Sequence, residues 1–184
     1  MVTTIKAPAQ WLLDPSHSSV EFAVKHMVIS TVRGRFAKYS ADIHFDEAQP
    51  HNSVVEATVD LASVDTREPR RDDHLRSADF FDVQNHPTMH FKSRSITPQG
   101  RGQYKVVGNL TIRGITREVA LDAAYSGIAK DPWGSLRAGF SLEGSVNRKD
   151  FGLVWNQALE AGGVLVGDTI KIAIDGEIVK QQAA

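Results

Sequence analysis

Seven histidines are the side chains of this sequence most able to bind a metal ion, and one short acidic run beside a histidine could transfer protons. The histidines form no HExxH motif, and no pair on one element has the spacing of metal ligands. Because the chain contains no cysteine, disulfides, cysteine-bound zinc, iron–sulfur clusters and thiol catalysis are excluded. We therefore expect neither a metal site nor a bound cofactor.

The acidic run consists of Asp72, Asp73 and His74, and carboxylates beside an imidazole suit general acid–base catalysis. On a short helix, however, adjacent residues point in different directions, and arginines stand on both sides of this run. Helix capping and ion pairing therefore explain these residues more simply than catalysis does. We predict no catalytic residues and keep one alternative, an enzyme that acts on an amphiphile with these three side chains at its site.

The composition is that of an ordinary globular chain of 184 residues, 41% hydrophobic and 23% charged, with a formal net charge of −1. This near-neutral balance argues against a nucleic acid as partner. No apolar run reaches the length of a transmembrane helix, and the first residues lack the basic and apolar regions of a secretory signal. We expect one domain over 1–184, with a core from about 11 to 178, in the cytoplasm, or in the periplasm if a signal peptide has been removed.

The elements that must position these side chains are strands, because alternation with a period of two dominates the sequence. Eight segments alternate apolar with polar residues between short turns: 20–26, 39–45, 55–61, 89–91, 104–112, 119–125, 140–146 and 170–178. This pattern predicts eight antiparallel strands in a barrel or a sandwich. Phe36 is out of phase with Tyr39, which predicts a bulge or bend, and a short helical insertion is predicted near residues 67–81.

One end of such a barrel is predicted to be rich in arginine. In an up-and-down meander every second connection lies at the same end, which brings together residues 26–34, 64–86, 112–117 and 147–156. These segments hold eight of the twelve arginines of the chain. Their nine basic and seven acidic residues nearly cancel, so we expect an ion-paired rim with little net charge.

The chain resembles the YceI family of lipocalin-like polyisoprenoid-binding proteins, from about Trp11 to Ile178, and the resemblance rests on six blocks in the same order. The blocks read WLLDPSHS, VRGRF, RDDHLRS with DFFD, NHP, GNLTIRGITR, and RKDFGLVW with VGD. The resemblance implies an all-β fold, an eight-stranded antiparallel up-and-down lipocalin-like barrel. It also implies a long amphiphilic ligand, such as a polyprenyl phosphate or an isoprenoid quinone, and often a homodimer.

The predicted ligand site combines the apolar faces of the strands with polar side chains at the arginine-rich end. The apolar candidates are Val20, Phe22, Val24, Phe36, Ile43, Phe45, Val55, Val59, Met89, Phe91, Leu110, Ile112, Phe140 and Trp155. The candidates for binding a head group are Arg33, Arg71, His74, Arg113 and Arg117. We predict a non-enzymatic protein that binds, carries or sequesters such a lipid. A second alternative is a stress-related interaction protein whose barrel is filled by side chains.

Overall fold

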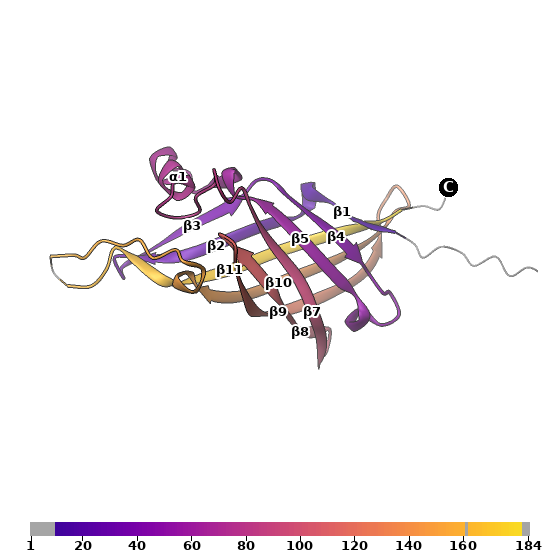
Figure 1. Cartoon of the computed structure of the whole chain (residues 1–184). Coiled ribbons are helices and arrows are strands. Elements are labelled where there is room, and N and C mark those ends of the chain that lie inside the picture. The colour runs from indigo at the N-terminus through magenta and orange to yellow at the C-terminus, as the bar shows by residue number, and fades with distance from the viewer. Residues whose placement is uncertain (1–9, 161, 182–184) are drawn as a thin grey trace, which may run out of the picture.

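The computed structural model describes residues 10–160 and 162–181, which form an antiparallel sheet with one short α-helix beside it (Figure 1). The strands are β1 (Trp11–Leu13), β2 (Ser19–His26), β3 (Ser30–Phe36), β4 (Tyr39–His44), β5 (Val54–Asp60), β6 (Val64–Asp65), β7 (Thr88–Gly100), β8 (Gln103–Ile112), β9 (Ile115–Lys130), β10 (Leu136–Asn147) and β11 (Val166–Lys180). The helix is α1 (Pro69–Arg76), and 3-10 turns occur at η1 (Pro15–His17), η2 (Pro50–Asn52), η3 (Leu61–Ser63) and η4 (Arg148–Phe151). No helix in these two ranges is both long enough and apolar enough to cross a membrane.

The strands follow the order β4-β5-β7-β8-β9-β10-β11-β2-β3-β6, and β1 pairs with the last part of β11. Strands β7 to β11 therefore pair with their neighbours in the chain, as the predicted meander requires. The sheet curls into a half-barrel (Figure 1), and Ala37 and Lys38 carry the chain from β3, near one edge, straight into β4 at the other edge. These two residues are the predicted bend between Phe36 and Tyr39.

The predicted count of eight strands was wrong, because β1, β3 and β6 add three more to the sheet. β1 and β6 are too short to show a period. In β3 the alternation is hidden by Gly34, which takes a position where an apolar side chain would mark the inner face. A Cβ atom there would lie 2.4 Å from the Phe22 ring, so glycine is needed for the ring of the neighbouring strand to fit.

The predicted helical insertion is the two-turn helix α1. The Glu68 side chain accepts a hydrogen bond from the Arg70 amide, Pro69 occupies the first turn, and Ser77 caps the end of the helix after Arg76. Asp72 is buried and accepts hydrogen bonds from the backbone N–H and the hydroxyl of Thr66, at 2.9 and 2.5 Å. The helix is therefore fixed to the end of β6.

Apolar clusters occupy both ends of the half-barrel. At the end where α1 lies, Phe80, Leu110, Ile112, Phe151 and Leu153 pack together. At the other end the buried residues are Trp11, Phe45, Ala138 and Ile178, packed against further aromatic side chains. The inner face of the sheet between these two clusters encloses the candidate site.

Candidate functional site

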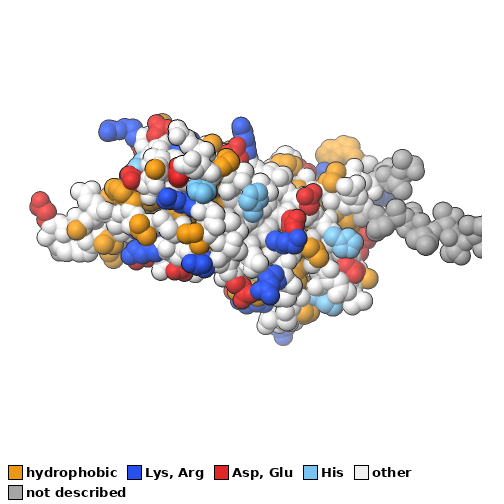
Figure 2. All heavy atoms as spheres, in the orientation of Figure 1, with side chains coloured by type: hydrophobic (Ala, Val, Ile, Leu, Met, Phe, Trp, Pro, Cys, Tyr) orange, Lys and Arg blue, Asp and Glu red, His pale blue; other side chains and the backbone are white. Residues whose placement is uncertain are grey.

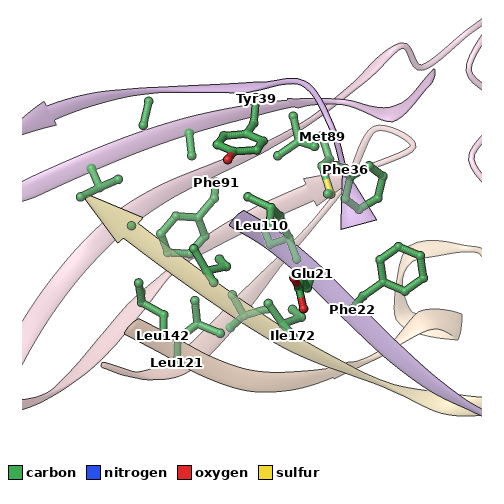
Figure 3. A pocket seen from close by; sticks show the side chains of 18 of the residues that line it. Glu21, Phe22, Phe36, Tyr39, Met89, Phe91, Leu110, Leu121, Leu142 and Ile172 are labelled. Carbon is green, nitrogen blue, oxygen red and sulfur yellow. The ribbon is translucent and has the colours of Figure 1, made fainter. Parts of the chain in front are cut away.

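A cavity of about 350 Å³ lies on the inner face of the sheet, and its lining is almost entirely apolar (Figure 3). In Figure 3 the side chains of Phe91, Leu121, Leu142 and Ile172 approach it from different strands. Thirteen of the fourteen predicted apolar candidates line the cavity: Val20, Phe22, Val24, Phe36, Ile43, Phe45, Val55, Val59, Met89, Phe91, Leu110, Ile112 and Phe140. The period of two therefore identified the inner face of each of these strands correctly.

The cavity is long, because β11 lines it from Val166 to Ile178. Twelve residue steps at about 3.3 Å each correspond to about 40 Å of strand. The predicted site omitted the isoleucines of this strand, Ile170, Ile172 and Ile174, although their alternation is plain in the sequence. A narrow, elongated and apolar space of this kind suits a chain-like ligand better than a compact one.

All three tyrosines of the chain line the cavity, and the predicted site missed them. The Tyr39 hydroxyl donates a hydrogen bond to the Ser18 carbonyl at 2.5 Å, and burial raises its pKa. Tyr125 stacks on Phe140, with ring centroids 5.2 Å apart. Burial also raises the Tyr125 pKa, and the neighbouring Tyr104 and Glu47 raise it further. The Tyr39 and Tyr125 hydroxyls therefore stay neutral, and the three tyrosines give the apolar lining a few hydrogen-bonding groups.

Glycine and alanine residues on the inner face of the sheet differ in how much empty space they leave in the cavity. A Cβ atom at Gly108 would lie 2.5 Å from the Phe91 ring, so this ring already fills the space that glycine vacates. Ala41 and Ala57 face each other on β4 and β5, and Ala57 also pairs with Phe91 on β7. Both alanines line the cavity, so their short side chains help to keep it open.

The four arginine-containing connections do meet at one end, as predicted. Arg113 donates to the Phe80 carbonyl at 2.7 Å, the Met27 amide donates to the Leu165 carbonyl at 2.9 Å, and the His74 and Trp155 rings lie 4.6 Å apart. These contacts join the segments after β2, β5, β8 and β10.

Six of the predicted site residues lie outside the lining of the cavity: the head-group candidates Arg33, Arg71, His74, Arg113 and Arg117, and the apolar candidate Trp155. The physical reason is that loops leave backbone carbonyls without partners, and the arginines bind these instead. Arg71 donates to the Thr66 carbonyl and hydroxyl at 2.9 and 2.8 Å, and Arg117 donates to the Thr116 carbonyl. Arg33 is exposed on β3.

Arg148 is the arginine that reaches the cavity lining, and the predicted site did not include it. Only 3% of it is exposed, and it donates to the carbonyls of Leu153, Trp155 and Gly167 at 2.6, 2.8 and 2.9 Å. Burial lowers its pKa, and the negative charge of Asp168 opposes this shift. Arg148 therefore holds the β10–β11 connection closed over this end of the cavity.

Asp72, Asp73 and His74 do not form a shared acid–base site. Asp72 caps the Thr66 amide, Asp73 pairs with Arg76 at 2.9 Å, and His74 Nε2 lies 2.9 Å from the Asp79 carboxylate. The three side chains point to three different partners, as expected for neighbours on a short helix.

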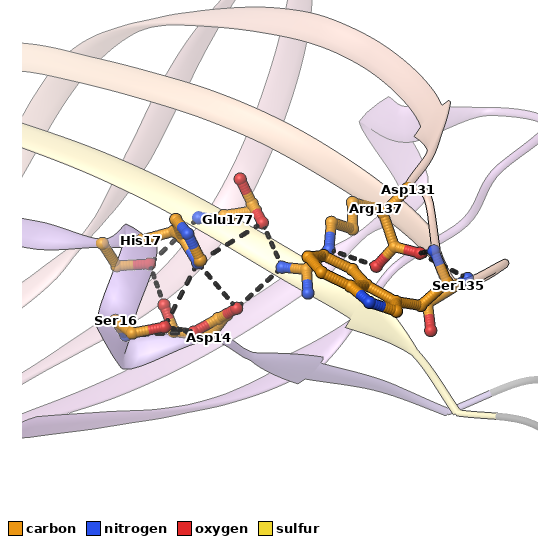
Figure 4. Close-up of polar contacts among 9 residues, drawn as sticks. Asp14, Ser16, His17, Asp131, Ser135, Arg137 and Glu177 are labelled. Atoms are coloured by element: carbon orange, nitrogen blue, oxygen red, sulfur yellow. Dashed lines mark hydrogen bonds and ion pairs between the residues drawn. The ribbon is translucent and has the colours of Figure 1, made fainter.

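A polar cluster closes the opposite end of the half-barrel (Figure 4). Within the described ranges, Asp14, His17 and Glu177 form a group whose ligand atoms lie within 4.8 Å of one another, close enough to hold a metal ion. However, Arg137 donates to both carboxylates of this group, and to Asp131 at 2.9 Å. Its positive charge occupies the place that a cation would take, so this cluster fastens η1, β10 and β11 together.

Comparison with known proteins gives the family. Residues 11–178 match the model of the YceI-like domain. The chain belongs to the YceI-like family. A UPF0312 protein of Staphylococcus aureus is 37% identical to it over 165 residues, which are 89% of this chain and 94% of that protein.

Solved structures share the YceI-like fold. The YceI protein of Campylobacter jejuni is 34% identical and superposes with a TM-score of 0.75, covering 86% of this chain and 90% of its own. A polyisoprenoid binding domain from Saccharophagus degradans, only 14% identical, superposes with a TM-score of 0.72 over 94% of this chain and 99% of its own. These likenesses confirm the all-β fold around the cavity.

Proposed function

We propose that this YceI-like protein binds a long amphiphilic lipid, such as a polyprenyl phosphate or an isoprenoid quinone, and carries or sequesters it in the cavity. The observation that carries the proposal is the elongated, almost wholly apolar lining between β2, β4, β5 and β7–β11. Each five-carbon isoprene unit that leaves water gains on the order of 3–4 kcal/mol before ordering costs, at about 0.8 kcal/mol per CH₂. The polyisoprenoid-binding domain of Saccharophagus degradans, which shares this fold, supports the same class of ligand.

The tyrosines favour a ligand whose head group is bound by hydroxyl groups. Tyr104 and Tyr125 lie near each other at the end away from α1, and the structure gives neither hydroxyl a side-chain partner among the described residues. A quinone carbonyl or a prenyl alcohol could accept or donate a hydrogen bond there without a charge being buried. Isoprenoid quinones therefore fit the described lining better than diphosphates, which need several cationic donors.

Binding to the delipidated protein tests the proposal. We expect isoprenoid quinones and polyprenyl alcohols with several isoprene units to bind one per chain, and the affinity to rise steeply with each unit. Replacing Tyr104 and Tyr125 by Phe should weaken quinone binding without changing the dependence on chain length. Absence of saturable binding for every long-chain isoprenoid offered would overturn the proposal.

A further inference from the structure

The loops at the α1 end of the half-barrel expose an apolar tip to solvent. The three-residue turn between β2 and β3 holds Met27, Val28 and Ile29, of which Val28 is 74% and Ile29 82% exposed. The β10–β11 connection lies against this turn, because the Leu165 carbonyl accepts the Met27 amide, and it exposes Val164. We call Met27, Val28, Ile29 and Val164 the apolar tip.

The backbone of this turn adopts a conformation that is unfavourable for its residues. Met27 and Val28 have φ values of 51° and 64°, in the left-handed region that glycine or asparagine normally occupies. A β-branched residue there is strained, and its apolar side chain gains nothing from facing water. Folding stability therefore explains neither the conformation nor the exposure of Val28.

Unpaired positive charges lie directly behind the tip. Lys25, Arg33 and Lys171 occupy outward positions of β2, β3 and β11, and Arg33 and Lys171 both pair with Ala23 in the sheet. Within the described part of the chain, none of the three makes an ion pair with a carboxylate. Two carboxylates lie four residues from Val164 in sequence: Glu160, which is exposed, and Asp168, which forms ion pairs with Arg148 and Lys149.

The tip also lies close in sequence to residues that line the cavity. Val24 lines the cavity two residues before His26, the last residue of β2. Val166 lines it one residue after Leu165, whose carbonyl accepts the Met27 amide of the tip. Figure 2 shows hydrophobic side chains gathered over this end of the molecule, with basic side chains among them.

We propose that this end docks on the surface of an anionic lipid bilayer, with the apolar tip inserted among the acyl chains and Lys25, Arg33 and Lys171 facing the head groups. Exposed apolar side chains in front of unpaired cations are what such a surface binds. The proposal goes beyond binding of a ligand in the cavity, because it concerns the surface from which a lipid would enter or leave.

Sedimentation with vesicles tests this proposal. We compare vesicles of phosphatidylcholine alone with vesicles that also contain phosphatidylglycerol. The protein should bind the second kind, and the double variant V28S/I29S should lower the partition coefficient by about tenfold or more. K25Q and K171Q should each lower the partition coefficient about fivefold. High salt should abolish the preference for vesicles that contain phosphatidylglycerol over vesicles of phosphatidylcholine alone.

Controls separate this result from misfolding and from cavity binding. Trp133 is 84% exposed in the β9–β10 turn, at the opposite end, so W133S should leave vesicle binding unchanged. The variant Ala57→Phe, which narrows the cavity, should still bind vesicles. The proposal is overturned if the protein ignores anionic vesicles, or if V28S/I29S binds them as the parent does. It is also overturned if V28S/I29S converts a dimer to a monomer while vesicles are not bound, because a second copy then covers the tip.

Discussion

Replacing Ala57 by Phe tests whether the inner face of the half-barrel encloses empty space. Ala57 lies between Ala41 and Phe91 on the inner face, and all three line the cavity. A phenyl ring has six carbons, so it takes the room of about one five-carbon isoprene unit. At about 0.8 kcal/mol per buried CH₂, loss of that unit weakens binding by about 4 kcal/mol, or about 10³-fold in Kd.

The same substitution has the opposite effect on the protein without ligand. Because the new ring enters an apolar void, its burial should raise the free energy of unfolding by about 1.5–3 kcal/mol. We expect chemical denaturation of the delipidated protein to show equal or greater stability, and titration with an isoprenoid quinone to show the weaker binding. The matched control is E56F, which places the same ring on the outer face of β5 and should change neither binding nor cavity.

A filled interior predicts a different result. If side chains already closed the space, as in the alternative of a stress-related interaction protein, Ala57→Phe would overpack the core. The delipidated variant would then lose about 1–3 kcal/mol of stability. Such a loss, with no effect on lipid binding, would refute the reasoning from the cavity.

Three further substitutions test the elements that close the half-barrel. R148K should lower the free energy of unfolding, measured by urea denaturation, by about 3 kcal/mol, because one ammonium cannot replace the forked donors that bind the carbonyls of Leu153, Trp155 and Gly167. An unchanged denaturation midpoint would contradict this role of Arg148. V28G should raise Tm by about 2–4 °C, since glycine adopts the left-handed φ without strain, and a fall in Tm would show that the Val28 side chain stabilises the fold. R137Q should lower stability at neutral pH more than at pH 3. Hydrogen bonds from Ser16 and Arg137 hold the Asp14 pKa far below its usual range, and a hydrogen bond from Arg137 also lowers the Asp131 pKa. The two ionised carboxylates therefore stabilise the fold fully above the usual carboxyl pKa of about 4, and this stabilisation is lost progressively as the pH falls from there toward their lowered pKa values. Equal destabilisation at both pH values would argue against this network.

The sequence was sufficient to predict the inner face of the sheet. Side chains on a strand alternate between two faces, so one apolar series, such as Val55 and Val59, places every second residue toward the cavity. The positions of turns then order the strands of the meander. β3 could not be found in this way, because Gly34 interrupts its apolar series to make room for the Phe22 ring.

The arginines show what alternation does not determine. Their gathering at one end follows from the order of connections, and the contacts of Arg113 confirm it. Which groups they bind depends on the carbonyls that the irregular loops leave unpaired, and this becomes visible only in three dimensions. Arg113 and Arg71 therefore stabilise loops, while Arg148 alone among the eight lines the cavity. The tyrosines lie on the same inner face as the predicted phenylalanines, so alternation places them there, but it does not show that their hydroxyls could bind a ligand.

Native mass spectrometry of the gently purified protein tests the central claim most directly. We expect a population whose added mass equals one isoprenoid-type lipid per chain, and loss of that added mass in Ala57→Phe but not in E56F. It would be contradicted by a protein that carries no added mass, and that also gains none when long-chain quinones or polyprenyl alcohols are supplied.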